Sequence, residues 1–159
     1  MPIFKYLHII TMFMAVSFSV GPEILLHRIA RTREVCTIRN AFRVGQPLGI
    51  AVPILFVIGL LFGLTAAFTG GFDFFAPWLI LAYIIFAIAF IVSAAITGPW
   101  QEKVGMAAAA SPDDKPSAEL AALIDAKTAQ YATWTLAIAI IAIVFVMVTK
   151  PGGIQPLFK

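Results

Sequence analysis

Residues 44–72 read VGQPLGIAVPILFVIGLLFGLTAAFTGGF and contain no charged side chain. Three further stretches without a charged side chain occur at Tyr6–Pro22, Phe74–Gln101 and Thr128–Thr149. Because a helix of about 20 apolar residues crosses the hydrocarbon core of a bilayer, each stretch is long enough for one span. We therefore expect an all-α fold, a bundle of four transmembrane helices, with spans at about 4–27, 46–69, 75–98 and 128–149.

The composition leaves room for one integral membrane domain over residues 1–159. Apolar residues make up 61% of the chain and charged residues only 12%, whereas a soluble domain has about 25% charged residues. The net charge of +3 does not indicate a nucleic-acid partner, because the basic residues gather at the ends of the spans. Cys36 is the one cysteine, which excludes a disulfide within the chain. The expected partner is the lipid bilayer.

The connections between the spans differ in character. Residues 28–43 are expected to form a basic loop that either binds anionic lipid head groups or only fixes the topology. Two adjacent glycines in Thr69–Asp73 predict a tight turn and an antiparallel hairpin of spans two and three. Residues 101–115 are expected to form a loop, and residues 116–149 one unbroken helix whose segment 116–127 lies at the interface or in the cytoplasm. The arginines of the basic loop are Arg28, Arg31, Arg33, Arg39 and Arg43.

The distribution of lysine and arginine predicts the orientation. The side with the basic loop holds eight of these residues and the opposite side three, namely Lys5, Lys150 and Lys159. By the positive-inside rule, both termini lie outside and the basic loop lies in the cytoplasm of a bacterial inner membrane. Aromatic residues are expected at both interfaces: Tyr6, Phe74, Phe75 and Trp78 outside, Trp100 and Tyr131 inside.

Small residues mark the faces on which membrane helices pack closely. Thr11, Ala15 and Ser19 recur at four-residue spacing in span one, and Gly59 and Gly63 form a GxxxG pair in span two. These residues predict helix packing, either within the bundle or, for the glycine pair, in an oligomer.

His8 is a titratable side chain inside a span, which makes it a candidate functional residue. It shares a helix face with Thr11, Ala15 and Ser19. Met147 near the outer end of the last span and Met12, one turn from His8, are candidate partners. A histidine and a methionine can ligate the iron of haem b. The same pair suits copper, with His8 as the metal ligand. The alternative is a structural imidazole bonded to a nearby carbonyl or hydroxyl group.

A second group of polar residues, Glu23, His27 and Arg28, lies at the inner end of span one. Glu23 and His27 are four residues apart and therefore adjacent on a helix. The cluster is expected to anchor the helix at the interface, with Glu23 pairing to an arginine of the basic loop. The alternative is a site for a proton or an anionic ligand beneath the kink expected at Pro22.

Several motifs carry a resemblance to known membrane proteins. Lys5-Tyr6-Leu7-His8, the Gly-Gly-Phe turn before Ala76-Pro77-Trp78-Leu79, and Gly98-Pro99 resemble an uncharacterised bacterial family of four-helix integral membrane proteins, a domain of unknown function. A more distant similarity is to copper-resistance D type proteins and HemJ-type protoporphyrinogen oxidases. The latter resemblance implies haem bound by His8.

The sequence contains no HExxH, GxSxG, phosphate-binding glycine loop or CxxC motif, so we expect a protein that is not an enzyme. We expect an accessory, anchoring or assembly subunit of a membrane complex, with another membrane subunit or a second copy as partner. The alternatives are a haem-b-binding redox protein that uses His8 and a copper-handling protein.

Overall fold

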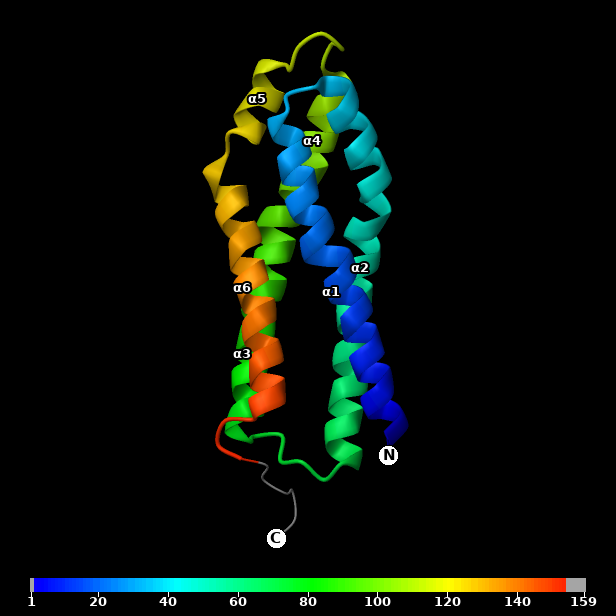
Figure 1. Cartoon of the computed structure of the whole chain (residues 1–159), viewed down its shortest axis with the longest axis vertical. Helices are drawn as coiled ribbons and strands as arrows, with labels where there is room; N and C mark the ends of the chain where they lie inside the picture. Colours follow the sequence, from blue (N-terminus) through cyan, green and yellow to red (C-terminus); the bar gives the residue numbers. More distant parts are fainter. Residues whose placement is uncertain (1, 154–159) are drawn as a thin grey trace.

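The computed structural model describes residues 2–153 and is an elongated bundle of helices (Figure 1). Four helical stretches are long and apolar enough to cross a membrane: α1, α2, the joined α3–η1–α4, and the joined α5–α6. This confirms the expected all-α bundle of four transmembrane helices. The elements are α1 Pro2–Arg31, α2 Val35–Thr69, α3 Pro77–Val92, the π-helical η1 Ser93–Thr97, α4 Gly98–Ala110, α5 Ala118–Ile124 and α6 Lys127–Thr149.

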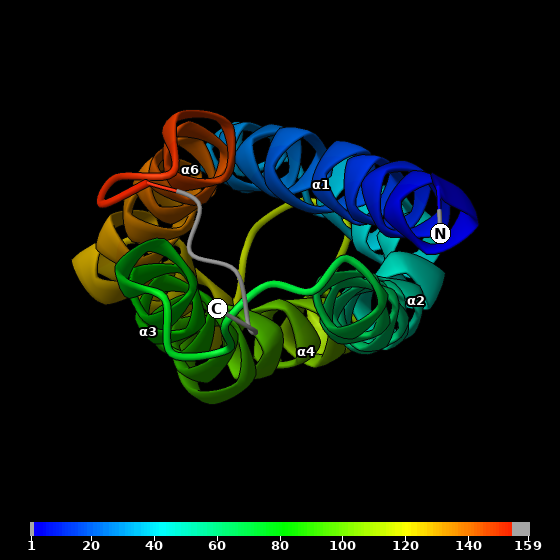
Figure 2. The same cartoon turned by 90° about the horizontal axis from the view of Figure 1, so that it is seen from below.

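The helices associate in two pairs along most of their length. α1 packs along α2, and α3 packs along α6, an arrangement that is visible from below in Figure 2. α2 and α3 run antiparallel and are joined by a short turn, as expected of a hairpin, but spans two and three make contact mainly between α2 and α4. The turn between them, with Gly71 at φ 68°, crosses from one pair to the other.

The basic segment 28–43 is helical except at Thr32–Glu34, so the expected loop is wrong. Arg33 adopts a φ of 62°, which reverses the chain after α1. Val35, Ile38 and Phe42 then recur at helical spacing and are all buried, so their packing extends α2 far beyond the predicted span. At about 1.5 Å per residue, the 35 residues of α2 reach about 52 Å, well over a hydrocarbon core of about 30 Å.

The expected loop at 101–115 is also wrong over most of its length, because α4 continues to Ala110. Pro99 has no N–H to donate and would normally break a helix. The π-helical turn η1 precedes it directly and accommodates the lost hydrogen bond. Val104, Ala107 and Ala108 of α4 are buried, which stabilises this extension.

The single helix expected at 116–149 is broken at Asp125 and Ala126. The Trp100 indole N–H donates to the carbonyl oxygen of Leu123 at 2.9 Å and so satisfies an acceptor at the end of α5. Arg33 forms an ion pair with Asp125 at 2.8 Å. These two contacts hold the break in place, and α6 begins at Lys127.

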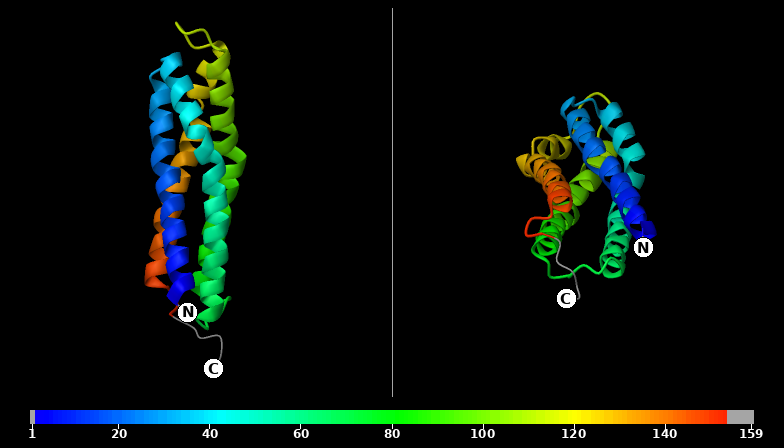
Figure 3. Two further views of the ribbon diagram at one scale, coloured as in Figure 1. Left: turned by 90° about the vertical axis from the view of Figure 1, so that its right-hand side faces the viewer. Right: turned by 60° about the horizontal axis from the view of Figure 1, so that its bottom comes forward.

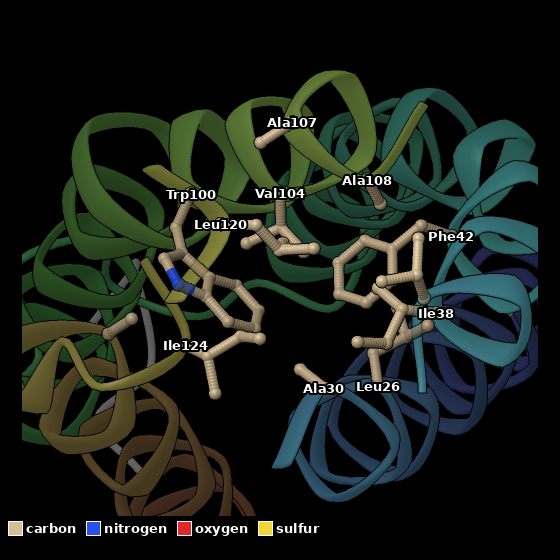
Figure 4. Close-up of a cluster of buried hydrophobic side chains, with 12 residues drawn as sticks. Leu26, Ala30, Ile38, Phe42, Trp100, Val104, Ala107, Ala108, Leu120 and Ile124 are labelled. Carbon is tan, nitrogen blue, oxygen red and sulfur yellow. The ribbon is translucent and has the colours of Figure 1, made fainter. Parts of the chain in front are cut away.

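The bundle has a tightly packed end opposite the end where α1 begins and α6 finishes (Figures 1 and 3). We call it the arginine end, and its core joins α1, α2, α4, α5 and the start of α6 (Figure 4). Trp100 is only 5% exposed there and packs inside the protein. Its core comprises Leu26, Ala30, Val35, Ile38, Phe42, Trp100, Val104, Ala107, Ala108, Leu120, Ile124 and Ala129.

A smaller cluster lies at the other end of the bundle, around Trp78 of α3 and Val146 of α6. Trp78 is 4% exposed, so it too is buried. By contrast, many large apolar side chains along the middle of the helices are exposed, as the bilayer requires for residues that face lipid.

Candidate functional site

A cavity of about 230 Å³ lies between the two helix pairs. α1, α2, α3, η1, α4 and α6 all contribute to its wall, which is predominantly apolar. Four polar side chains interrupt this surface: Ser19, Glu23, Ser93 and Gln101. The two helix pairs contact each other mainly at the arginine end. Because they are further apart beyond it, helix packing does not close the cavity.

Glu23 is the one acidic residue in the cavity wall, and it is only 6% exposed. The hydroxyl of Thr133 on α6 donates to Oε1 of Glu23 at 3.1 Å, and the Thr97 side chain on η1 also lies beside this carboxyl group. Thr97 and Thr133 are themselves buried. Residues from α1, η1 and α6 thus position one carboxyl group at the edge of an apolar cavity.

Two prolines of the cavity wall alter the local backbone. Pro22 in α1 and Pro53 in α2 lie inside helices and lack the N–H that would bond four residues back. The carbonyl oxygens of Phe18 and Gly49 therefore lack the usual donor four residues on, and both residues also line the cavity. In a membrane such free backbone groups are tolerated where they face protein or a cavity.

A buried carboxyl group is costly to keep in an apolar environment unless it is hydrogen-bonded. The Thr133 hydroxyl that donates to Glu23 also lies 3.1 Å from the carbonyl oxygen of Ala129, so its hydrogen is shared between two acceptors. The carboxyl group thus retains capacity to accept further hydrogen bonds from a molecule in the cavity. This arrangement suits recognition of a hydrogen-bond donor.

The other members of the expected cluster do not join Glu23. The ring of His27 stacks on Trp100 with centroids 3.9 Å apart, and its Nε2 is buried without a hydrogen-bond partner. Arg28 is exposed. The two ion pairs found within residues 2–153 join Arg33 to Asp125 and Arg39 to Asp113, so the expected pairing of Glu23 with an arginine is replaced by the bond from Thr133.

His8 lies outside the cavity, against α2. Its Nδ1 is 2.7 Å from the carbonyl oxygen of Gly59, so Nδ1 donates this hydrogen bond. A Cβ atom on Gly63 would come within 2.8 Å of the His8 ring, so this glycine makes room for the imidazole. Met12 lies against Gly59 and lines the cavity.

Met147 lies in a different environment from His8. It packs with the Trp78 cluster on α3 and α6, whereas His8 and Met12 lie on the α1–α2 pair. Within residues 2–153, no group of three or more His, Cys, Asp or Glu side chains is arranged to hold a metal ion.

Some of the small residues predicted to pack helices together are buried in the bundle. Thr11 and Ala15 are buried, and Thr11 and Met12 are the side chains nearest to Gly59. Ser19 donates to the carbonyl oxygen of Val16 and lines the cavity. The GxxxG pair therefore supports contact between α1 and α2 within the chain.

The five arginines have different environments. Arg39 contacts Asp113 and the carbonyl oxygens of Ala108 and Ser111, and so closes the end of α4. Arg31 donates to Gln130, and Arg33 pairs with Asp125. Arg43 makes a long 3.5 Å contact to Asn40, and Arg28 is exposed.

No pattern in the sequence distinguishes Thr97, Thr133 or Gln101 as site residues. Glu23 is separated from Thr133 by 110 positions, a distance over which no spacing argument applies. One feature of the sequence could have indicated these residues. A glutamate among apolar helices requires hydrogen-bond donors, and threonine hydroxyl groups on neighbouring helices can supply them.

The fold and its intramembrane cavity define an integral membrane protein built from four spans. The family described as "Predicted integral membrane protein (DUF2269)" has a model that matches residues 2–151. The chain belongs to this family, which confirms the resemblance to a family of membrane proteins of unknown function. No curated protein and no solved structure matched the chain.

Proposed function

We propose that this protein binds a small lipophilic molecule in the cavity between its two helix pairs, without transforming it. The observation that carries this proposal is the buried Glu23 carboxyl group at the wall of an otherwise apolar cavity. Binding sites of this kind combine a predominantly apolar lining with a few polar groups that fix the orientation of the ligand.

The size of the cavity limits the ligand. An apolar cavity of about 150 Å³ accommodates benzene, so about 230 Å³ suits a ring with a short substituent or a short branched chain. Glu23, Gln101 and Ser93 would meet its polar end, and Val16, Phe86 and Ile140 its apolar part.

The carboxyl group restricts the polar end to a hydrogen-bond donor such as an amine, an alcohol or a phenol. A molecule without a donor would leave the acceptor positions of Glu23 that Thr133 does not occupy without a partner, which is unfavourable in an apolar cavity. A ligand with a donor gains a hydrogen bond in a low-dielectric environment, where it contributes most.

Thermal unfolding of the purified protein in detergent tests this proposal with hexylamine, hexanol and hexyl methyl ether as probes. We expect hexylamine and hexanol to raise the unfolding midpoint in a saturable manner, and the ether to have little effect. Glu23→Leu should abolish the difference between the probes. Equal shifts with all three probes in the wild type, or a difference between the probes that persists in Glu23→Leu, would contradict the proposal.

A substitution that fills the cavity provides an independent check. Ala139 is 9% exposed and lines the cavity, so Ala139→Leu should abolish the shift with hexylamine. Ala87→Leu makes the same change at an exposed alanine of α3 and should leave the shift intact.

A second candidate function is binding of haem b or copper by His8. The supporting observation is the bond from Nδ1 to the Gly59 carbonyl, because a metal-ligating histidine is usually oriented by a carbonyl on its other ring nitrogen. His8 would supply one ligand through Nε2. Absorption spectra and elemental analysis test this function: a Soret band or bound copper that His8→Ala removes and His27→Ala retains is the expected result. A colourless, metal-free protein after supplementation with haem and copper would contradict it.

The accessory, anchoring or assembly role expected from the sequence fits a protein that binds without catalysis. In this proposal the chain lies in a bacterial inner membrane with its arginine end in the cytoplasm. Co-purification in mild detergent tests the role: a stoichiometric membrane partner would support it, and a monomer free of partners after gentle extraction would oppose it.

A further inference from the structure

A surface groove separate from the cavity lies where α1 ends and α6 begins. Its wall contains three basic side chains, Arg31, Arg33 and Lys127, and one acidic side chain, Asp125. Two aromatic residues, Tyr131 and Trp134, lie on the α6 side, and Ile124 and Gln130 complete the lining. We call this surface the basic groove.

The charges of the basic groove are only partly neutralised within the chain. Arg33 pairs with Asp125, but both side chains are exposed, at 51% and 63%. Arg31 donates to the neutral Gln130, and Lys127 is exposed at the start of α6. Three cations and one anion leave a net positive surface that is complementary to a phosphate group.

The groove continues into a face of α6 that is suited to acyl chains. Tyr131 and Trp134 are 66% and 55% exposed, and they are followed at helical spacing by the exposed Ile138, Ile141 and Phe145. α6 has 23 residues and so measures about 34 Å, close to a hydrocarbon core of about 30 Å. A helix of this length begins close to the boundary between the hydrocarbon core and the head groups, a region in which tryptophan and tyrosine are favoured.

We propose that the basic groove binds an anionic phospholipid, with its phosphate between Arg31 and Lys127 and its acyl chains along the exposed face of α6. Charge complementarity supports the head group, and the continuous apolar stripe supports the chains. Arg39 does not contribute to this site, because its guanidinium already donates hydrogen bonds to Ala108, Ser111 and Asp113 at the end of α4. This site is independent of the cavity and of Glu23.

Native mass spectrometry of the full chain with added lipids tests the site. We expect phosphatidylglycerol to bind more tightly than phosphatidylcholine of the same acyl composition. Removing one cation near an anionic lipid surface lowers affinity about fivefold. Lys127→Gln and Arg31→Gln should therefore each weaken binding of phosphatidylglycerol by about that factor.

Lys103→Gln is the matched control, because Lys103 is an exposed lysine of α4 outside the groove. It should leave the affinity for phosphatidylglycerol unchanged. Trp134→Ala should weaken the binding of both phospholipids, because the substitution removes apolar contact and leaves the charge of the groove unchanged. Equal binding of the two lipids, or equal effects of Lys103→Gln and Lys127→Gln, would overturn the proposal. Binding of inorganic phosphate with the same affinity as phosphatidylglycerol would assign the groove to a free anion and would also overturn it.

Discussion

The arginine end and the cavity region use the same four helical stretches in opposite ways. At the arginine end, Trp100 joins α4 to α1, α2 and α5 by stacking on His27, by edge contact with Phe42 and by a hydrogen bond to Leu123. In the cavity region, the helix pairs leave about 230 Å³ between them and bury a carboxyl group at its wall. The difference indicates that stability is concentrated at one end, which allows the other region to remain open for a ligand.

The largest expected effect comes from Trp100→Ala. The substitution removes a buried indole and the side-chain hydrogen bond to the Leu123 carbonyl. Loss of a buried aromatic side chain costs about 3–5 kcal/mol, so we expect a strong decrease in the free energy of unfolding. Chemical denaturation in detergent measures it. Trp134→Ala, at a 55% exposed tryptophan, should cost far less, and equal costs would show that the burial of Trp100 does not stabilise the arginine end.

A pair of identical substitutions compares the packing directly. Ala108 is fully buried at the arginine end, so Ala108→Leu should cost about 1–3 kcal/mol through overpacking. Ala139 lines the cavity, where space for the added atoms exists, so Ala139→Leu should be close to neutral. Unfolding in detergent compares both. If Ala139→Leu destabilises the protein as much as Ala108→Leu, the cavity is not an open space.

Arg39→Ala should have a smaller effect, about 1–2 kcal/mol. The guanidinium donates to two carbonyl oxygens at the end of α4 and contacts Asp113, but the side chain is 33% exposed and water replaces part of these bonds. Thermal unfolding measures the loss. Arg43→Ala is the control, because Arg43 makes one long contact, to Asn40. A similar loss for both arginines would show that Arg39 does not close α4.

Glu23→Leu should have the smallest effect on stability, with no loss or a slight gain. Thr133 retains the Ala129 carbonyl as an acceptor, so the substitution leaves no hydroxyl unpaired and removes a buried polar group from an apolar wall. Thermal unfolding without added ligand measures this change. A loss above about 2 kcal/mol would mean that Glu23 holds the bundle together, as breaking a buried polar contact does.

The four spans were predictable because hydropathy acts locally along the chain. The extension of α2 to Val35 and of α4 to Ala110 was not, since it depends on the burial of Ile38, Phe42 and Val104 against helices distant in sequence. The break at Asp125 depends likewise on Trp100, and no local pattern reports it. Local signals such as arginine and proline predicted loops at positions where tertiary packing favours helix.

The candidate site was predictable only in part. Glu23 and His8 stood out because ionisable residues are rare in apolar segments. The sequence could not pair Glu23 with Thr133, nor separate it from His27, because both outcomes depend on how α1 rotates against α4 and α6. Met147 and His8 were placed at equal depth, but depth does not decide which helices are neighbours, and α1 packs along α2 while α6 packs along α3.

The central claim, that the cavity holds a lipophilic molecule through Glu23, is tested most directly by native mass spectrometry of protein purified in mild detergent. We expect the wild-type protein to carry a small non-protein mass that is stable to mild activation. Glu23→Leu and Ala139→Leu should lose this mass, and Ala87→Leu should keep it. The same adduct on all four proteins, or none on the wild type even after exposure to a membrane lipid extract, would contradict the claim.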